Sequence, residues 1–268
     1  TFGDEGFSVV ASGGSSGASI VYTSSNNSVA RVDANSGAVT LLGAGEVTIT
    51  ASKAADGFYE AVSASYQLEI SKSTQAFSFL GDVANTFGNA SFTHTVEDGP
   101  GSGAIIYSSA DTSIVTVNSS TGEVIIVGVG ETTVTANKAA DENYEAASAS
   151  YTVTIAQASQ AALLFDAAGP LNKVFGDATF TQAVTGGSGS GAVTYASDNT
   201  DIARVNASTG EVSIVAAGSV AITASKAADS NYLRQSVMYS LNITQAAQQP
   251  LSFESAGPVA KTFGAGDF

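Results

Sequence analysis

The amino-acid sequence predicts an all-β protein in which two-layer antiparallel sandwiches follow one another along the chain. The first observation is a segment that occurs three times, as SGAVTLLGAGEVTITASKAADGFY, TGEVIIVGVGETTVTANKAADENY and TGEVSIVAAGSVAITASKAADSNY. The second is a strict alternation of apolar and polar residues in short runs, which is typical of strands with one buried face. The third is the Gly- and Ser-rich clusters that separate these runs. Self-similarity of this kind indicates a tandem array.

A Phe-Gly pair sets the phase of the repeat. It recurs at Phe2, Phe87, Phe175 and Phe263, so the spacings are 85, 88 and 88 residues. A unit of this length is close to a small all-β domain and can bury a core of its own. The sequence therefore predicts three repeats and the beginning of a fourth, at residues 1–72 (without its first strand), 73–157, 158–245 and 246–268.

The second repeat shows the expected order of elements. Its C-terminal run alternates Tyr151, Val153 and Ile155 with polar residues, and the other two repeats have the same pattern. Seven short strands separated by turns indicate a two-sheet sandwich. We expect these strands near residues 77–79, 91–96, 104–108, 114–117, 123–127, 132–137 and 148–155.

Two kinds of turn are predicted in each repeat. Residues 33–37, 118–122 and 206–210 should form hairpin loops in which an Asp or Asn side chain bonds local backbone and the final Gly takes a positive φ. Pairs of the form Gly-x-Gly, such as Gly43 with Gly45 and Gly128 with Gly130, should form the next turn.

The ordered set of motifs resembles the bacterial immunoglobulin-like repeats, especially the MBG type, whose units carry a Tyr/Phe-Gly pair near the start. The set runs Phe-Gly, Ser-Gly, Tyr-x-Ser, (Ser/Thr)-Gly-x-Val, Gly-x-Gly, (Ile/Val)-Thr-Ala and Lys-Ala-Ala-Asp-x-x-Tyr, and it covers essentially the whole chain. The resemblance implies an Ig-like sandwich used as a building block of long bacterial surface proteins, commonly adhesins. The third repeat departs from the pattern at Arg234 and at Ala216-Ala217-Gly218.

Composition narrows the classes of partner. Nine basic residues against 24 acidic ones give a formal charge of -15, which repels phosphate backbones and anionic lipid headgroups. We therefore expect no nucleic-acid partner and no electrostatic binding to membranes. No apolar run approaches the length of a membrane span, so no membrane insertion is expected. The resemblance implies a location outside the cell, at its surface. The absence of cysteine excludes disulfides, thiolate metal sites and cysteine nucleophiles.

The Asp-x-x-Tyr pairs are the most prominent candidate site. One interpretation is a carboxylate and a phenol that line a repeated ligand site. The favoured interpretation is structural, with the tyrosine hydroxyl bonding nearby backbone as in the tyrosine corner of Ig folds. The pairs are Asp56 with Tyr59, Asp141 with Tyr144, and Asp229 with Tyr232.

Neither a cofactor nor an enzymatic activity is predicted. Calcium is the metal to consider, but the acidic residues are scattered, and the junctions at residues 71–75, 156–160 and 244–249 contain no carboxylate. His94 is the one histidine of the sequence, and it is expected to be a solvent-facing strand residue. The segment around Gly43 has no predicted helix behind it, so it is not expected to bind phosphate.

The chain ends leave two functional hypotheses open. Leu251 and Phe253 lie 88 residues after Leu163 and Phe165, so they belong to the first strand of a fourth repeat. The chain is then either a segment of a longer stalk, or a subunit whose C-terminal strand completes the first repeat of the next copy, head to tail. A third alternative, a carbohydrate-binding module, would need exposed aromatic platforms, and the chain has no Trp.

Overall fold

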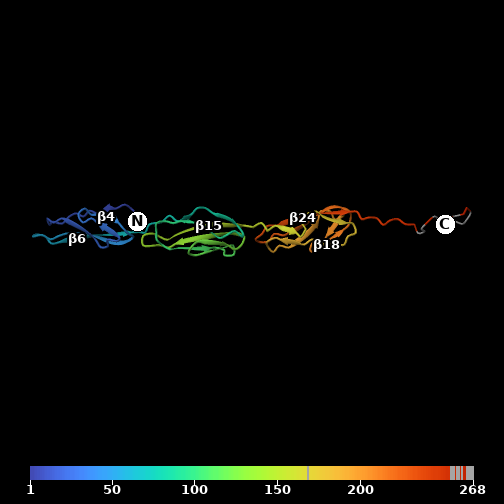
Figure 1. The fold of residues 1–268 in the computed structure, drawn as a ribbon. Helices are drawn as coiled ribbons and strands as arrows, with labels where there is room; N and C mark the ends of the chain where they lie inside the picture. Colours follow the sequence, from blue (N-terminus) through green and yellow to red (C-terminus); the bar gives the residue numbers. More distant parts are fainter. Residues whose placement is uncertain (168, 254–256, 258–259, 261, 264–268) are drawn as a thin grey trace. The chain divides into compact units, whose positions relative to one another are not determined.

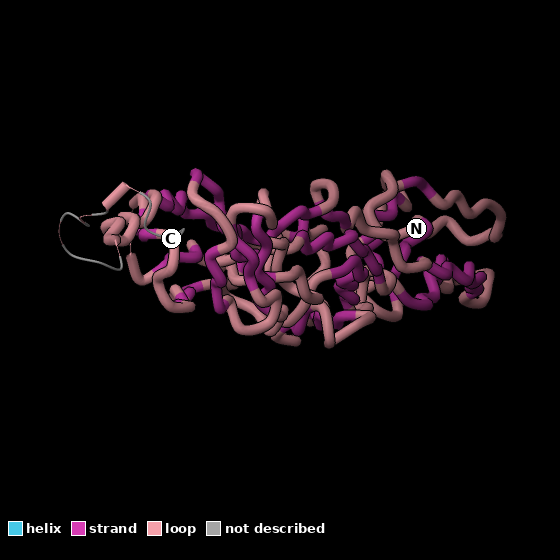
Figure 2. The backbone as a smooth tube through the Cα atoms, turned by 90° about the vertical axis from the view of Figure 1, so that its right-hand side faces the viewer, coloured by secondary structure: helices cyan, strands magenta, loops and turns pink. Residues whose placement is uncertain are grey.

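The structure is a computed structural model, which describes residues 1–167, 169–253, 257, 260 and 262–263. The chain divides into two compact units, Thr1–Ala158 and Ser159–Phe268. Every regular element of the described residues is a strand, as Figure 2 shows. The predicted all-β class is confirmed.

The first repeat lies in the first unit and has two three-stranded antiparallel sheets. One sheet has the order β1-β4-β3 and the other β2-β5-β6. The longest ladder joins β5 to β6 without interruption, from Gly45 opposite Ile70 to Lys53 opposite Val62. The strands are β1 (Phe7–Ser8), β2 (Ile20–Ser24), β3 (Ala30–Val32), β4 (Ala38–Leu41), β5 (Gly45–Lys53) and β6 (Val62–Ile70).

The second repeat, in the same unit, has nine short strands. Its sheets have the orders β11-β14-β15-β8, β12-β13-β9 and β10-β7, and β8 runs parallel to its neighbour β15. Figure 1 labels β15. The strands are β7 (Ser78–Phe79), β8 (Val83–Thr86), β9 (Phe92–Thr93), β10 (Val96–Glu97), β11 (Ile105–Ser109), β12 (Val115–Val117), β13 (Glu123–Ile126), β14 (Gly130–Lys138) and β15 (Ala147–Ala156).

The third repeat forms the second unit and repeats this arrangement. Its sheets have the orders β17-β24-β23-β20, β18-β22-β21 and β16-β19. The strands are β16 (Leu163–Phe165), β17 (Leu171–Val174), β18 (Phe180–Thr181), β19 (Val184–Gly186), β20 (Val193–Ser197), β21 (Ala203–Val205), β22 (Glu211–Ile214), β23 (Gly218–Lys226) and β24 (Gln235–Thr244).

Each repeat buries an apolar core of its own. In the second repeat the alternate residues Tyr151, Val153 and Ile155 of β15 are at most 4% exposed, so the predicted period-2 pattern is confirmed there. Three separate clusters of buried residues result, each confined to one repeat. The first repeat differs at Tyr66, which is 48% exposed although it is the equivalent of Tyr151.

The prediction of seven strands was wrong in two places. Residues 91–96 form two strands, β9 and β10, in different sheets, because the chain crosses from one layer to the other between them. The strand β8 was not predicted, because Val83 is its one large apolar residue and its parallel partner β15 is far away in sequence.

His94 lies at this crossing and is not simply a solvent-facing residue. Its ring stacks on Phe79 at 5.4 Å between centroids and meets Tyr151 edge-on at 4.6 Å. A ring nitrogen lies 3.1 Å from the carbonyl oxygen of Gly81. His94 therefore packs as an aromatic side chain against Phe79 and Tyr151.

The hairpin loops have the predicted chemistry. The Asn118 side chain accepts hydrogen bonds from the backbone N–H groups of Ser120 and Thr121, at 2.9 and 3.0 Å. The last residue, Gly122, has a φ of 71°, and its two repeat equivalents have 72° and 73°. A Cβ on Gly122 would lie 3.0 Å from the Tyr107 ring, so glycine is required both by conformation and by space.

Candidate functional site: the Asp-x-x-Tyr loops and the first junction

The aspartate of each Asp-x-x-Tyr motif fixes the loop that contains it. The Asp141 carboxylate accepts hydrogen bonds from the backbone N–H groups of Asn143 and Tyr144, at 2.9 and 2.8 Å. It also accepts from the N–H of Ser102, at 2.6 Å, and from its hydroxyl, at 3.0 Å. The carboxylate thus joins its own loop to the loop that precedes β11.

The same arrangement recurs in the other repeats. Asp56 accepts from Gly17, Phe58 and Tyr59 N–H groups at 2.8 to 2.9 Å. Asp229 accepts from Ser190 at 2.6 Å and from its own loop. These N–H donors stabilise the charged form, so they lower the pKa of all three carboxyl groups. At Asp141 the Ser102 N–H is the largest cause, and the pKa falls from 3.8 to about 2.

Acid should therefore destabilise this loop in a narrow window of pH. The pKa of Asp141 is lower in the folded state, so its contribution to stability is complete above pH 4 and is lost as the pH falls toward 2. We expect Asp141→Asn to lower the melting temperature of the first unit at pH 7. The difference from the unmodified protein should shrink between pH 4 and pH 2, as followed by circular dichroism. A difference that stays constant with pH would contradict this assignment of the carboxylate.

Tyr59 and Tyr144 do not form the predicted tyrosine corner. In the described part of the chain, the hydroxyl groups of Tyr59 and Tyr144 form no hydrogen bond, and it is the backbone N–H groups of these residues that bond the aspartates. A tyrosine hydroxyl does bond backbone elsewhere, where Tyr22 accepts from the Ala11 N–H at 2.8 Å. The ring of Tyr144 instead contacts Phe2 of the first repeat, edge-on, at 5.5 Å between centroids.

The polypeptide that connects the first two repeats is held along its length. Ser73 forms a parallel bridge with Tyr144, through Ser73 N–H to Asn143 C=O at 2.8 Å and Glu145 N–H to Ser73 C=O at 2.9 Å. The Gln75 side chain donates to the carbonyl of Glu145 at 2.7 Å. The connection is therefore a bonded strand and not a free linker.

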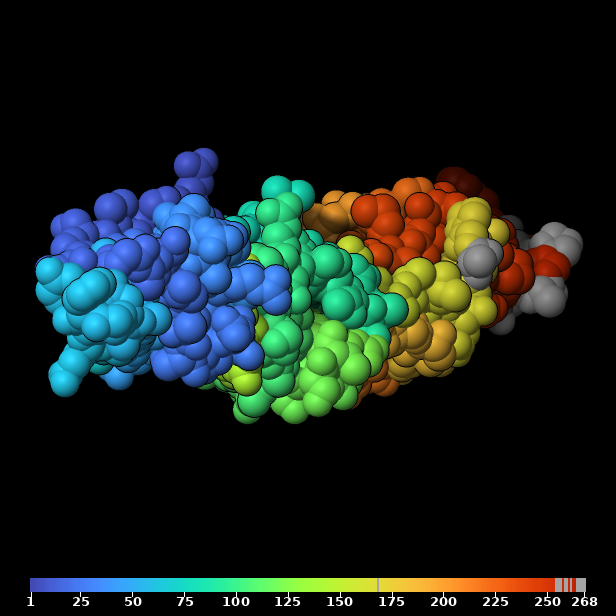
Figure 3. All heavy atoms as spheres, turned by 90° about the vertical axis from the view of Figure 1, so that its left-hand side faces the viewer, coloured from blue at the N-terminus to red at the C-terminus, as the bar shows by residue number. Residues whose placement is uncertain are grey.

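Two further contacts join the body of the first repeat to the second. Asn143 Oδ1 accepts a hydrogen bond from the backbone N–H of Ala44, in the Gly43–Gly45 turn, at 2.9 Å. The Lys72 ammonium donates to the carbonyl of Asp141. Together with the contact between Phe2 and Tyr144, these two hydrogen bonds connect the Asp-x-x-Tyr loop of the second repeat to three parts of the first repeat. In Figure 3 the atoms of the first repeat, in blue, lie directly against the green atoms of the second.

Sequence reasoning did not find Asn143 as a junction residue. The signal was present, because the residue before the tyrosine is Asn143 in the second repeat, Asn231 in the third and Phe58 in the first. Phe58 is 93% exposed and Tyr59 is 51% exposed. The loop of the first repeat thus keeps the aspartate hydrogen bonds but lacks the amide that holds the junction.

The remaining candidates are Leu251 and Phe253 and the scattered acidic residues. Leu251 and Phe253 are fully exposed. Asp98 pairs with Lys138, whose side chain is 1% exposed, so this acidic residue is committed to an ion pair. Among the described residues, no three acidic or histidine side chains are grouped so that they could hold a metal ion. Nor does any helix there have the length and apolar character needed to cross a membrane.

Two regions of the chain match families of known domains. Residues 6–55 match the family described as intimin, immunoglobulin-like domain, and residues 170–232 match the bacterial Ig-like domain of group 2. A search of curated proteins finds no match.

Solved structures that match this chain include cadherin ectodomain fragments. Mouse cadherin-23 EC22-24 is 16% identical, covers 85% of this chain and 86% of its own, and has a TM-score of 0.32. Drosophila N-cadherin EC1-3 is 11% identical, with coverages of 91% and 94% and a TM-score of 0.35. Mouse protocadherin-24 EC1-3 is 15% identical, with the same coverages and a TM-score of 0.33.

Proposed function

We propose that this chain, which is built of bacterial Ig-like domains in tandem, is a spacer in an extracellular surface protein. In this role the repeats form a stalk that holds a distal binding region away from the cell. Both matching families are Ig-like domains, of a kind typical of extracellular surface proteins. The three separate cores support the proposal, because a spacer needs units that fold in series.

The observation that carries the proposal is the bonded junction between the first two repeats. A spacer transmits its length only if its junctions resist bending. Five residues of free Gly/Ser-like linker would behave as a coil with an end-to-end distance of about 12 Å in any direction. Here the connecting residues are held by backbone and side-chain hydrogen bonds, and the Ala44 to Asn143 bond adds a fixed point beside them. Each sandwich, with strands of about 20 Å and its end loops, would then contribute roughly 35 to 45 Å of length.

The alternative of a carbohydrate-binding module is less well supported. Sugar platforms need exposed aromatic faces, whereas two of the three repeat-equivalent tyrosines, Tyr151 and Tyr239, are 4% and 6% exposed; the third, Tyr66, is 48% exposed. The rings of Tyr151 and Tyr239 pack against Phe79 and Phe165 inside the sandwich.

The distance across the junction tests the spacer proposal. The chain has no cysteine, so the variant Thr40→Cys, Ser119→Cys carries spin labels at these two positions only. Both residues are exposed, Thr40 in the first repeat and Ser119 in the second. We expect a narrow distance distribution by double electron–electron resonance. Asn143→Ala should broaden it, because the amide bond to Ala44 is lost.

A matched control distinguishes the loss of the hydrogen bond between Asn143 and Ala44 from a general effect of replacing an asparagine. Asn35→Ala removes an exposed amide in a hairpin loop whose side chain bonds nothing across the junction, and it should leave the distribution unchanged. If the unmodified protein already gives a broad distribution, like that of a free linker, the junction does not act as a stiff element and the spacer proposal fails.

A further inference from the structure

The strand β8, which the sequence did not predict, joins the entering and the leaving parts of the second repeat in one sheet. It follows the short first strand β7, and it pairs in parallel with the last strand, β15. The ladder has four residue pairs, from Val83 opposite Val153 to Thr86 opposite Ala156. The third repeat has the same feature, because β17 pairs in parallel with its last strand, β24, over four residue pairs as well.

Parallel pairing decides how a pull along the chain loads these strands. The chain enters β8 at Val83 and leaves β15 at Ala156, and these two points lie at opposite ends of the ladder. A pull at both points slides one strand along the other, so all the hydrogen bonds of the ladder are loaded together. If the entering and leaving strands were antiparallel, the same pull would act at one end and would open the bonds one after another.

Further contacts fix the ladder of the second repeat. At one end the Asp82 carboxylate accepts a hydrogen bond from the Thr152 N–H at 2.7 Å. At the other end the Phe87 N–H donates to the Ala156 carbonyl at 3.0 Å, and the third repeat has the equivalent of this bond at 2.9 Å. The side chain of Val83 packs against the buried core. A slide of β8 along β15 would therefore break these contacts together with the ladder.

The short strand before each ladder is held by fewer bonds. The strand β7 pairs with β10 over two residue pairs, and β16 pairs with β19 over three. A pull from the N-terminal side reaches these short strands first, so they should open before the parallel ladders take the load. The ladders are then the elements that decide the force at which each repeat unfolds.

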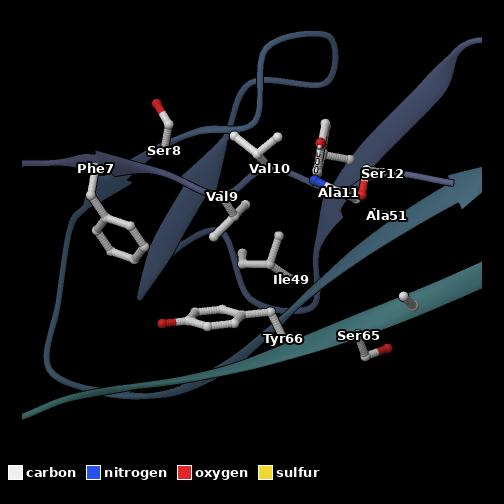
Figure 4. A pocket seen from close by; sticks show the side chains of 12 residues that line it. Phe7, Ser8, Val9, Val10, Ala11, Ser12, Ile49, Ala51, Ser65 and Tyr66 are labelled. Carbon is white, nitrogen blue, oxygen red and sulfur yellow. Dashed lines mark hydrogen bonds between the residues drawn. The ribbon is translucent and has the colours of Figure 1, made fainter.

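We propose that the second and third repeats bear tension along the chain, and that the β8–β15 and β17–β24 ladders resist their unfolding. The role goes beyond spacing, because a spacer needs stiff junctions but need not resist a pull. The first repeat is not included, since its sheet β2-β5-β6 ends at β6. Figure 4 shows this strand, whose Tyr66 lies with Ile49 of β5 opposite Phe7 and Val9 at a pocket of about 470 Å³.

The direction of the load tests the proposal without any change in β8. The chain has no cysteine, so handles for single-molecule force spectroscopy can be attached through cysteines at chosen places. With a handle at each end of the chain, the second and third repeats should each unfold in one step that releases roughly 25 nm.

Handles at Ala90→Cys and Ala156→Cys, both exposed, change the direction of the load. The ends of β8 and β15 that lie near these residues are adjacent, because Thr86 is opposite Ala156. The pull then opens the ladder from one end. We expect this opening at no more than about half the force that the second repeat withstands between the chain ends.

Proline variants test the hydrogen bonds of the ladder. N–H groups two residues apart in a strand point to the same neighbour, so the N–H of Asn85, like that of Phe87, faces β15. The N–H of Ala84 faces the edge of the sheet. Asn85→Pro should raise the unfolding rate of the second repeat at constant force roughly tenfold, because proline has no N–H to donate.

Two controls are matched to this variant. Ala84→Pro places proline where the N–H is outside the ladder, and it should change the unfolding rate less than about twofold. Asn85→Ala removes the same side chain but keeps the N–H, so it should also leave the rate within about threefold. The unchanged third repeat serves as a reference within the same molecule.

Two results would overturn the proposal. One is an equal opening force for the two directions of load, which would mean that the ladder does not resist by sliding. The other is an equal effect of Ala84→Pro and Asn85→Pro, which would mean that the bonds of the ladder are not involved. The first comparison decides the matter even if Asn85→Pro does not fold. Neither result affects the spacer proposal, which depends on the distance across the first junction without load.

Discussion

Replacing Leu241 by Ala should lower the free energy of unfolding of the third repeat by about 3 kcal/mol, the usual cost of removing a fully buried leucine side chain. Leu241 is 0% exposed in the central strand β24, with Val220 and Leu171 as its partners on the neighbouring strands. Truncation leaves a cavity between the two layers. For a domain of this size the melting temperature should fall on the order of 15 °C.

The effect should be confined to the second compact unit. Leu241 belongs to a core cluster made wholly of residues of the third repeat. Calorimetry should therefore show one transition moving while the transition of Thr1–Ala158 stays in place. Met238→Ala, on the same strand but 66% exposed, is the matched control and should change the stability by less than about 0.5 kcal/mol. A common shift of all transitions would mean that the repeats do not fold independently.

The features that the sequence predicted correctly depend on local chemistry. The Asn118 to Gly122 loop requires only a side chain that accepts two nearby N–H groups and a glycine with positive φ, and both can be read from five residues. The buried face of β15 follows from alternation within one strand. Because the same motifs occur in all three repeats, a prediction made for one repeat applies to the other two.

The features that were missed depend on partners far away in sequence. Strand β8 is defined by its parallel pairing with β15, about seventy residues later, and its own composition is weakly apolar. Asn143 contacts Ala44 across 99 positions of sequence, which no local pattern encodes. The exposure of Tyr66 likewise depends on whether a strand covers it, and alternation alone assigned it to the core.

In the candidate site, too, one part could be predicted from local sequence and another part could not. The aspartates Asp56, Asp141 and Asp229 were identified from the recurrence of the motif, and they do form one recurrent structure. The motif suggested that the phenol bonds the backbone, whereas at Tyr59 and Tyr144 the backbone N–H group bonds the aspartate and the hydroxyl forms no such bond. In the second repeat the motif is better described as a carboxylate-fixed loop whose following side chains, Asn143 and Tyr144, contact the first repeat.

The radius of gyration of the full chain in dilute solution tests the central claim, that repeats in series act as a spacer, most directly. Three repeats of roughly 35 to 45 Å placed end to end would form a rod with a radius of gyration of about 30 to 40 Å. A compact globule of the same 268 residues would have about 18 Å. Small-angle X-ray scattering, at concentrations where the chain is monomeric, distinguishes the two. A spacer of three repeats in series would give a value of at least about 30 Å, and a value near 18 Å would contradict the spacer proposal.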